Sequence, residues 1–179
     1  MLRHFSLERG SFLLYFQNVD IYFKKYALFS QASLTLNGKK VIAVDDELDI
    51  VETIEERLEM CDIKTATAYE SAKQLLETET FDVAFFDIMG VKGYELLSIA
   101  TEKGITSVML TAHAISSENF NKAMDGGACA YLPKDSLHQI DVYLAEIFEQ
   151  GKEAQGINGN WFGRLRGYFE NQFGSNWLD

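Results

Sequence analysis

The sequence lacks an apolar run of the length that crosses a membrane. Every apolar stretch is broken well short of the roughly 20 residues that a membrane-spanning helix needs. Residues 11–16 are largely apolar, but Gln17, Asn18 and Asp20 interrupt them before the core of a secretion signal is complete. We therefore expect a cytoplasmic protein.

Cysteine and basic residues are also scarce. The two cysteines, Cys61 and Cys129, lie far apart without metal-ligand spacing, which is typical of a reduced cytoplasmic protein rather than a disulfide scaffold. The net charge is −11; residues 1–40 carry +4, so the rest of the chain carries −15. Because nucleic acid is bound largely by neutralising phosphates, we expect no nucleic-acid ligand.

Two apolar runs, by contrast, are present, and each ends in carboxylates. Residues 83–86 show no polar alternation, which indicates a parallel strand covered on both faces, and Asp87 follows them. Residues 40–44 form a second run, closed by Asp45 and Asp46. In open α/β sheets, ligands bind at the carboxyl edge of the strands. These three carboxylates are therefore expected at one functional edge.

Strand and helix patterns alternate from residue 39 to about residue 150. Strands are predicted at 40–44, 64–68, 82–87, 106–111 and 128–132, and helices at 48–58, 71–78, 94–102, 116–124 and from 135 or 136 to 150. Short connections between them imply right-handed parallel crossovers. The predicted fold class is α/β, a doubly wound, flavodoxin-like sheet of five parallel strands in the order 2-1-3-4-5. Asp135 or Ser136 is expected to cap the fifth helix, with Gln139 completing a capping box.

The predicted strand ends define a phosphoryl-transfer site. Clustered Asp45, Asp46 and Asp87 would repel one another, and Mg²⁺ with its oxygen ligands would resolve that repulsion. Asp87 is the candidate nucleophile, since a carboxylate can form an acyl phosphate. Lys134 would balance charge on the phosphoryl oxygens, and the Thr111 hydroxyl would donate to one of them.

Four motifs, each closing a predicted strand, make residues 39–150 resemble the receiver domain of bacterial two-component response regulators. The motifs are Val44-Asp45-Asp46-Glu47, Phe85-Phe86-Asp87, Met109-Leu110-Thr111-Ala112 and Tyr131-Leu132-Pro133-Lys134. The resemblance implies that Asp87 accepts a phosphoryl group from a sensor histidine kinase or a phosphotransfer protein. It also implies that Asp46 binds Mg²⁺ directly, Asp45 mainly through water, and Met89 through its backbone carbonyl. Thr111 and Tyr131 would be the switch pair: the hydroxyl moves toward the phosphate while the ring rotates inward.

The chain departs from the family pattern in two places. The loop 89–93 is shorter than usual and lacks a proline, which puts its path in question. Pro133 precedes Lys134 rather than following it, so the family's cis Lys-Pro bond cannot form. Neither departure removes a reactive group.

Several alternatives remain open from the sequence. A Mg²⁺-dependent phosphohydrolase of the haloacid dehalogenase type also uses an Asp nucleophile, but its second Asp would stand where this chain has Met89. A pseudo-receiver that only binds partners would not need the carboxylate, Thr and Lys set. Asp45 and Asp46 could simply cap a helix, and Tyr131 could be an ordinary core residue. His113 either faces the site or lies in a solvated loop.

Residues 1–38 form the predicted N-terminal extension. Aromatic residues at three- and four-residue steps between Phe12 and Phe29 are typical of one helical face. The segment is an amphipathic helix docked on a partner, a membrane surface or the receiver itself, a poorly ordered tail, or a stretch outside the natural protein that is read from an upstream start. We expect residues 1–33 to be dispensable, and Asn37-Gly38 to mark the boundary of a receiver spanning 39–151.

Residues 152–179 form the predicted C-terminal extension, a polar, glycine-punctuated linker and an aromatic amphipathic helix from about Asn160 to Phe173. The helix could fold back on the receiver, bind a partner or make weak membrane contact. So short a segment cannot form a DNA-binding domain with its own core. The sequence therefore predicts a phosphorylation-controlled switch, not an enzyme acting on external substrates, without a DNA-binding output domain.

Overall fold

The computed structural model describes residues 32–112, 116–151 and 158–174. Five parallel strands form one sheet in the order β2-β1-β3-β4-β5, which confirms the predicted fold class and topology. The strands are β1 (Lys40–Val44), β2 (Asp62–Ala66), β3 (Val83–Asp87), β4 (Thr106–Thr111) and β5 (Ala130–Pro133).

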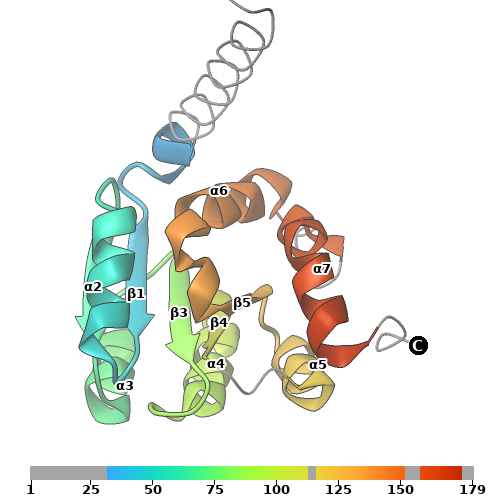
Figure 1. Cartoon of the computed structure of the whole chain (residues 1–179). Helices are drawn as coiled ribbons and strands as arrows, with labels where there is room; N and C mark the ends of the chain where they lie inside the picture. The colour runs from blue at the N-terminus through green and yellow to red at the C-terminus, as the bar shows by residue number, and fades with distance from the viewer. Residues whose placement is uncertain (1–31, 113–115, 152–157, 175–179) are drawn as a thin grey trace, which may run out of the picture.

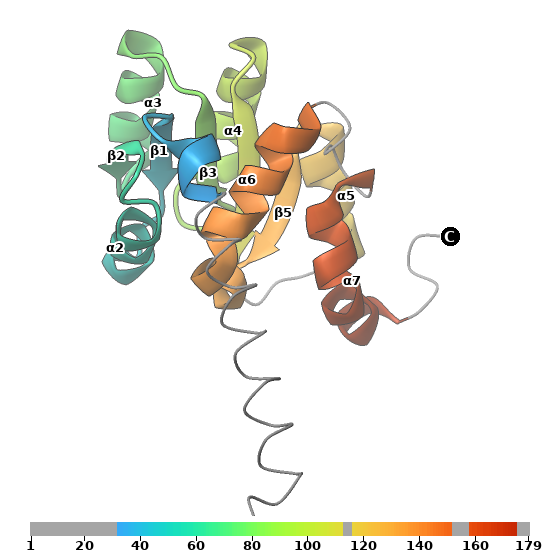
Figure 2. The ribbon, with the colours of Figure 1, turned by 90° about the horizontal axis from the view of Figure 1, so that it is seen from above.

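Helices cover both faces of the sheet, as Figures 1 and 2 show together. They are α2 (Leu48–Arg57), α3 (Tyr69–Thr78), α4 (Gly93–Glu102), α5 (Ser117–Asp125), α6 (Ile140–Gln150) and α7 (Asn160–Phe173), with a short 3₁₀ helix, η1 (Lys134–Gln139), before α6. One face carries α2 and α6, and the other carries α3, α4 and α5. The sheet is therefore the middle layer of a three-layer domain.

The central strands are buried because both of their faces pack against helices. Every residue of β3 is buried, Asp87 included, and β1 is buried from Val41 to Val44. This burial explains their continuous apolar sequences, which are typical of parallel strands. An Asp at the end of such a strand needs partners, and the site described below supplies them.

The strand register brings the functional ends to one edge. Val44 pairs with Phe86 across β1 and β3, and Asp87 pairs with Leu110 across β3 and β4. Thr111 in turn pairs with Pro133 across β4 and β5. The residues that follow these pairs therefore emerge side by side at the carboxyl edge of the sheet.

Three elements are displaced from their predicted positions by up to two residues. β2 spans Asp62–Ala66 rather than 64–68, α3 begins at Tyr69 rather than 71, and β5 spans Ala130–Pro133 rather than 128–132. β2 pairs only with β1 and alternates exposed with partly buried residues, so its apolar signal is weak. The start of α5 matches its prediction closely, since the Ser116 hydroxyl accepts a hydrogen bond from the Asn119 N–H at 3.1 Å.

The predicted capping box before the last receiver helix is wrong. Residues 134–139 instead form η1, and α6 begins at Ile140 without a side-chain cap. The Ser136 hydroxyl turns back and donates to the Pro133 carbonyl at 2.6 Å. Arg57 of α2 donates to the backbone carbonyl of His138 and to the Asp141 carboxylate, so a contact between distant elements determines this conformation.

The segment before β1 is anchored to the receiver. Residues 32–36 are helical, and the side chains of Ala32 and Leu36 are buried in the core. The Thr35 hydroxyl donates to Glu149 of α6 at 3.3 Å, and the Lys39 ammonium lies 4.8 Å from the centre of the Phe148 ring. The predicted aromatic helix between residues 12 and 29 lies outside the described residues. Within the described part of the chain, no helix has both the length and the apolar character needed to cross a membrane.

Helix α7 packs against the receiver domain, which is the first of the three alternatives for the C-terminal extension. Four of its apolar side chains are buried in the common core: Trp161, Phe162, Leu165 and Phe169. Figure 1 shows α7 running from the end of α6 toward α5, beyond β5, the last strand of the sheet. The apolar face of the helix is therefore covered by the chain itself.

Candidate phosphoryl-transfer site

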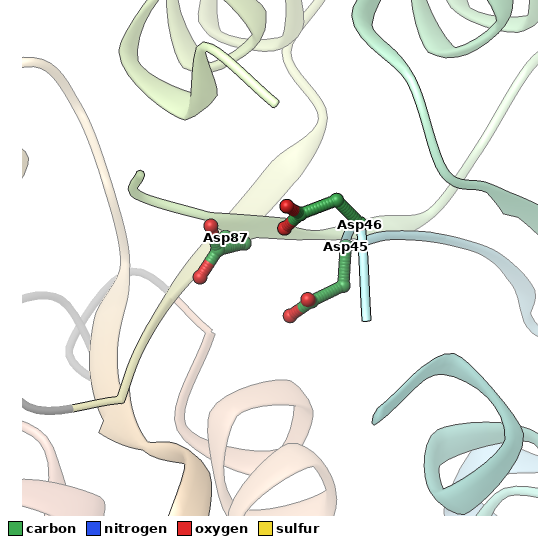
Figure 3. A group of neighbouring side chains, drawn as sticks. All are labelled: Asp45, Asp46 and Asp87. Atoms are coloured by element: carbon green, nitrogen blue, oxygen red, sulfur yellow. The ribbon is translucent and has the colours of Figure 1, made fainter. Parts of the chain in front are cut away.

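Three aspartates meet at the carboxyl edge, as the sequence predicts. Asp45 and Asp46 follow β1, and Asp87 ends β3. Each offers a carboxylate oxygen, and these oxygens all lie within 4.8 Å of one another. Figure 3 shows the carboxylates of Asp45 and Asp46 leaving the end of β1 on the side of Asp87. Asp45 is fully buried and Asp87 nearly so, whereas Asp46 is exposed.

Lys134 joins the carboxylates from the end of β5. Its ammonium lies 2.8 Å from Asp45 Oδ2, 2.9 Å from Asp87 Oδ1 and 2.7 Å from Glu47 Oε1. The Lys134 side chain is only 8% exposed, so its ion pairs with the buried Asp45 and Asp87 are shielded from solvent. Pro133 precedes Lys134 in an extended conformation, which directs the lysine into the site without a cis bond.

Burial sets the electrostatics of this cluster. Desolvation raises the pKa of Asp45 to about 6, and the hydrogen bonds from Lys134 and from the Glu47 N–H only partly offset it. For Lys134, desolvation lowers the pKa, but hydrogen bonds to Asp45, Glu47 and Asp87 outweigh it and leave the pKa above its ordinary value. The lysine is therefore a permanent cation held against the nucleophile.

The loop after β3 orients the Asp87 carboxylate. Its Oδ2 atom accepts hydrogen bonds from the backbone N–H groups of Met89 at 2.9 Å and Gly90 at 2.7 Å. A Cβ on Gly90 would lie 1.9 Å from Asp46 Oδ1. Only glycine therefore allows the loop to lie this close to the Asp46 carboxylate. The short loop thus holds one oxygen of Asp87, while Lys134 contacts the other.

The backbone conformation of Lys92 connects the short loop after β3 to α4. This residue adopts a left-handed backbone conformation, with φ of 53°, directly before α4. Its ammonium lies 4.8 Å from the centre of the Tyr69 ring, which anchors the loop on α3. The loop thus reaches α4 through this turn without a proline.

The carboxylates border an open pocket that suits a small, hard cation and a phosphoryl group. The pocket, about 390 Å³, is lined by Asp46, Glu47, Asp87, Met89, Gly90, Thr111, Ala112 and Lys134. Asp45 Oδ2 is buried and, among the described residues, has no hydrogen bond beyond its ion pair with Lys134. An all-oxygen donor set with spare acceptor capacity fits Mg²⁺, which keeps several waters and takes few protein ligands.

Thr111 and Tyr131 lie where the switch prediction requires them. Thr111 ends β4, is 3% exposed and lines the pocket beside Asp87. Tyr131, in β5, is fully buried and packs edge-on against Phe120 with ring centres 5.6 Å apart. Burial raises the pKa of Tyr131 to about 12, and the nearby Thr111 hydroxyl acts in the opposite direction. In the described part of the chain the Tyr131 hydroxyl has no partner at normal hydrogen-bond geometry. The structure thus shows the ring in an inward position; the switching itself stays a prediction.

Two site residues were missed from the sequence. Glu47 forms an ion pair with Lys134. Its position directly after the two aspartates could have indicated that it belongs to the site. Gly90 contacts Asp46 and Asp87. A glycine within three residues of the nucleophile could have indicated a close approach of the loop backbone to the site. His113 lies outside the described residues.

Comparison with known proteins places the chain in a family. The family model described as "Response regulator receiver domain" matches residues 41–144, more than half of the chain. The protein belongs to the response regulator receiver family, the class that its sheet order and acidic site define. It is therefore a receiver domain protein of two-component signalling.

Individual relatives agree with this assignment. The "Two-component response regulator ARR18" of Arabidopsis thaliana is 32% identical over 103 residues, which cover 54% of this chain and 16% of that protein. Among solved structures, the receiver domain of the Francisella response regulator 1452 is 26% identical with a TM-score of 0.57, covering 64% of this chain and 100% of that one. A CheY-like receiver domain from Methanospirillum hungatei JF-1 is 28% identical with a TM-score of 0.53, with coverage of 64% and 100%.

Proposed function

We propose that this protein is a phosphorylation-controlled switch that accepts a phosphoryl group on Asp87. The observation that carries the proposal is the contact set of this carboxylate. One oxygen is paired with the Lys134 ammonium at 2.9 Å, and the other accepts two backbone N–H bonds from the following loop. The carboxylate is thereby fixed in orientation beside a pocket open to an incoming donor.

The donor is a phosphohistidine on a sensor histidine kinase or a phosphotransfer protein. A carboxylate oxygen of Asp87 attacks phosphorus, a P–O bond forms, and the P–N bond to the imidazole breaks. The imidazole leaves with the electron pair and takes up a proton from solvent. Lys134 stays beside the carboxylate and balances charge on the phosphoryl oxygens, while the Thr111 hydroxyl donates to one of them.

Asp46 and Asp45, with Asp87 and the Met89 carbonyl, would hold Mg²⁺ at this site. When bound, Mg²⁺ supplies charge neutralisation between the three carboxylates and the anionic phosphoryl group. Asp46 is suited to direct contact because it is exposed at the pocket, whereas Asp45 is buried and already paired with Lys134.

The chemistry stops at the protein's own phosphorylation and its reversal. Hydrolysis of external phosphate esters in the haloacid dehalogenase manner needs an acid/base two residues after the nucleophile. That position is Met89, whose side chain is 76% exposed and carries no proton to transfer. We therefore propose that the protein acts as a signalling component of the cytoplasm rather than as a phosphohydrolase.

Intact-mass measurement after incubation with acetyl phosphate and Mg²⁺ tests this function. The wild-type protein is expected to gain one phosphoryl group, and peptide mapping is expected to place it on Asp87. The matched control is Asp87→Asn, which keeps the oxygen that accepts the loop N–H bonds but cannot form the acyl phosphate. Equal phosphorylation of the variant, or sustained turnover of phosphate esters by the wild type, would contradict the proposal.

A further inference from the structure

Helix α7 binds the receiver through a defined set of contacts. The Arg164 guanidinium donates to Glu146 of α6, with Nε 2.8 Å from Oε1. The Gln150 side chain accepts a hydrogen bond from the Asn160 N–H at 2.9 Å, which satisfies one free donor at the start of α7. These polar contacts hold the first turns of α7 against the C-terminal half of α6.

The aromatic face of α7 reaches the switch tyrosine. The Phe169 ring centre lies 6.4 Å from that of Tyr131 and 5.7 Å from that of Phe120. Phe120, on α5, also contacts Tyr131 directly. These three rings, one each from α5, β5 and α7, form a closed group that we call the ring triad. Both Tyr131 and Phe169 are fully buried, so α7 forms part of the wall that keeps Tyr131 inside.

The other side of Tyr131 faces the phosphoryl site. Tyr131 pairs with Met109 in β4, and two residues later Thr111 pairs with Pro133. Thr111 lines the pocket of Asp87 and lies near the Tyr131 hydroxyl. Side chains therefore connect Phe169, through Tyr131 and Thr111, to the pocket that holds the nucleophile.

We propose that α7 is an effector helix carried on the same chain, whose docking on the ring triad is coupled to phosphorylation of Asp87 through Tyr131 and Thr111. The proposal rests on the phosphorylation function proposed above. The receiver matches its family over residues 41–144, whereas α7 begins at Asn160, so the coupling is a property of this chain and not of the matched domain.

The structure also assigns the sign of the coupling. A phosphoryl group on Asp87 draws the Thr111 hydroxyl toward itself, and the space behind Thr111 is best filled by an inward tyrosine. Docked α7 favours the inward position of Tyr131, because Phe169 packs against the buried ring and shields it from solvent. Docking and phosphorylation thus favour the same arrangement, and each strengthens the other by reciprocity.

Variants of α7 can shift docking in both directions. Phe169→Ala removes the ring that touches Tyr131. Gly163 and Gly167 are exposed helical residues with open space around their Cβ positions. Replacing both with Ala favours the helical form and so strengthens docking without touching the receiver. Gln172→Ala, on the exposed side of the same helix, is the matched control, because glutamine and alanine are both good helix formers.

The test is the affinity for beryllofluoride, a reversible mimic of the phosphoryl group, at fixed Mg²⁺. The amide resonance of Gly90 reports binding, since its N–H donates to the Asp87 carboxylate. We expect Phe169→Ala to weaken binding about fivefold or more, within the usual range of coupling between sites. The triple variant with both Gly→Ala changes should recover part of that loss, and Gln172→Ala should bind like the wild type. Hydrogen exchange of residues 160–173 should slow when beryllofluoride binds the wild type.

The outcomes separate the coupling from the proposed function. Wild-type affinity in Phe169→Ala, or a loss that the glycine replacements do not relieve, would overturn the coupling and leave the phosphorylation function intact. A wild-type protein that binds no beryllofluoride and gains no phosphoryl group from acetyl phosphate would overturn both. Circular dichroism of each variant verifies that the receiver remains folded.

Discussion

The ammonium of Lys134 lies 2.7 Å from the carboxylate of Glu47, at the rim of the phosphoryl pocket. The Glu47 side chain is 54% exposed, whereas the other two partners of Lys134, Asp45 and Asp87, are buried. The lysine therefore has two shielded partners and one that solvent screens. We therefore expect the ion pairs of Lys134 with Asp45 and Asp87 to contribute more to stability than its ion pair with Glu47.

Removing Glu47 should cost little, and removing Lys134 should cost much. Glu47→Gln leaves the buried ion pairs intact, so we expect a loss of roughly 0–1 kcal/mol in the free energy of unfolding. Lys134→Met leaves Asp45 buried without its cation, so we expect a loss of about 3 kcal/mol. Urea denaturation at pH 7 measures both values. Equal losses in the two variants would show that burial does not rank these partners.

Mg²⁺ affinity should depend more on Asp46 than on Asp45. Asp46 faces the pocket, whereas Asp45 is buried under Lys134. We expect Asp46→Ala to weaken Mg²⁺ binding by about tenfold, or about 1.4 kcal/mol, with little loss of stability. Asp45→Ala should have the smaller effect on Mg²⁺ and the larger effect on unfolding. Titration of intrinsic fluorescence with Mg²⁺, beside thermal unfolding, distinguishes the two; a reversed ranking would assign direct coordination to Asp45.

Gly90→Ala should damage the metal site and spare the fold. The new Cβ would meet the Asp46 carboxylate at 1.9 Å, and that side-chain end can move away. We therefore expect weaker Mg²⁺ binding with a nearly unchanged unfolding midpoint. At Gly93 the clash, at 2.0 Å, is with the backbone carbonyl of Asp87, which cannot move freely. Gly93→Ala should consequently lower the midpoint, and a Gly90→Ala protein with wild-type Mg²⁺ affinity would contradict the loop geometry.

Stability should fall at alkaline pH in part through Cys129. Burial raises the pKa of this thiol from 9.0 to about 11, so the unfolded chain loses its proton at lower pH than the folded one. The stabilising contribution is fully present below pH 9 and is lost as pH rises through 11, to a total of about 3 kcal/mol. Cys129→Ala should therefore show a shallower decline than the wild type between pH 9 and 11 in chemical denaturation. Parallel curves in that window would mean that burial does not raise the pKa of the thiol.

The sequence was sufficient for the two central strands β1 and β3, whose burial is two-sided. β1 and β3 are continuous apolar runs because helices cover both faces, and their ends were predicted correctly. β2 is an edge strand with charged Asp62 and Lys64 on its exposed side, so it lacks a continuous apolar run. Its predicted position was therefore two residues too far along the chain. η1 could not be predicted, because Arg57, far away in sequence, supplies the contacts that favour it.

The candidate site could be predicted as a set of strand ends but not as a set of contacts. Asp45, Asp46, Asp87, Thr111 and Lys134 each close a strand, and strand order alone brings them together. Which carboxylates Lys134 reaches depends on the path of a long side chain, so Glu47 was missed. The contact of Phe169 with Tyr131 depends on how α7 lies on the receiver, which helical spacing does not specify.

The position of α7 beyond β5 also bears on self-association. A parallel sheet has two open edges, and unpaired strand backbones are templates for pairing with other chains. At one edge, β2 carries Asp62 and Lys64 on exposed positions, and such charges discourage a second strand from adding there. At the other edge, β5 has the sequence Ala-Tyr-Leu-Pro, and every residue is buried. No charged residue in β5 discourages a second strand from pairing with it. The helix that covers the aromatic side of β5 therefore protects solubility as well, and any state in which it leaves must be brief or must exchange it for another occupant.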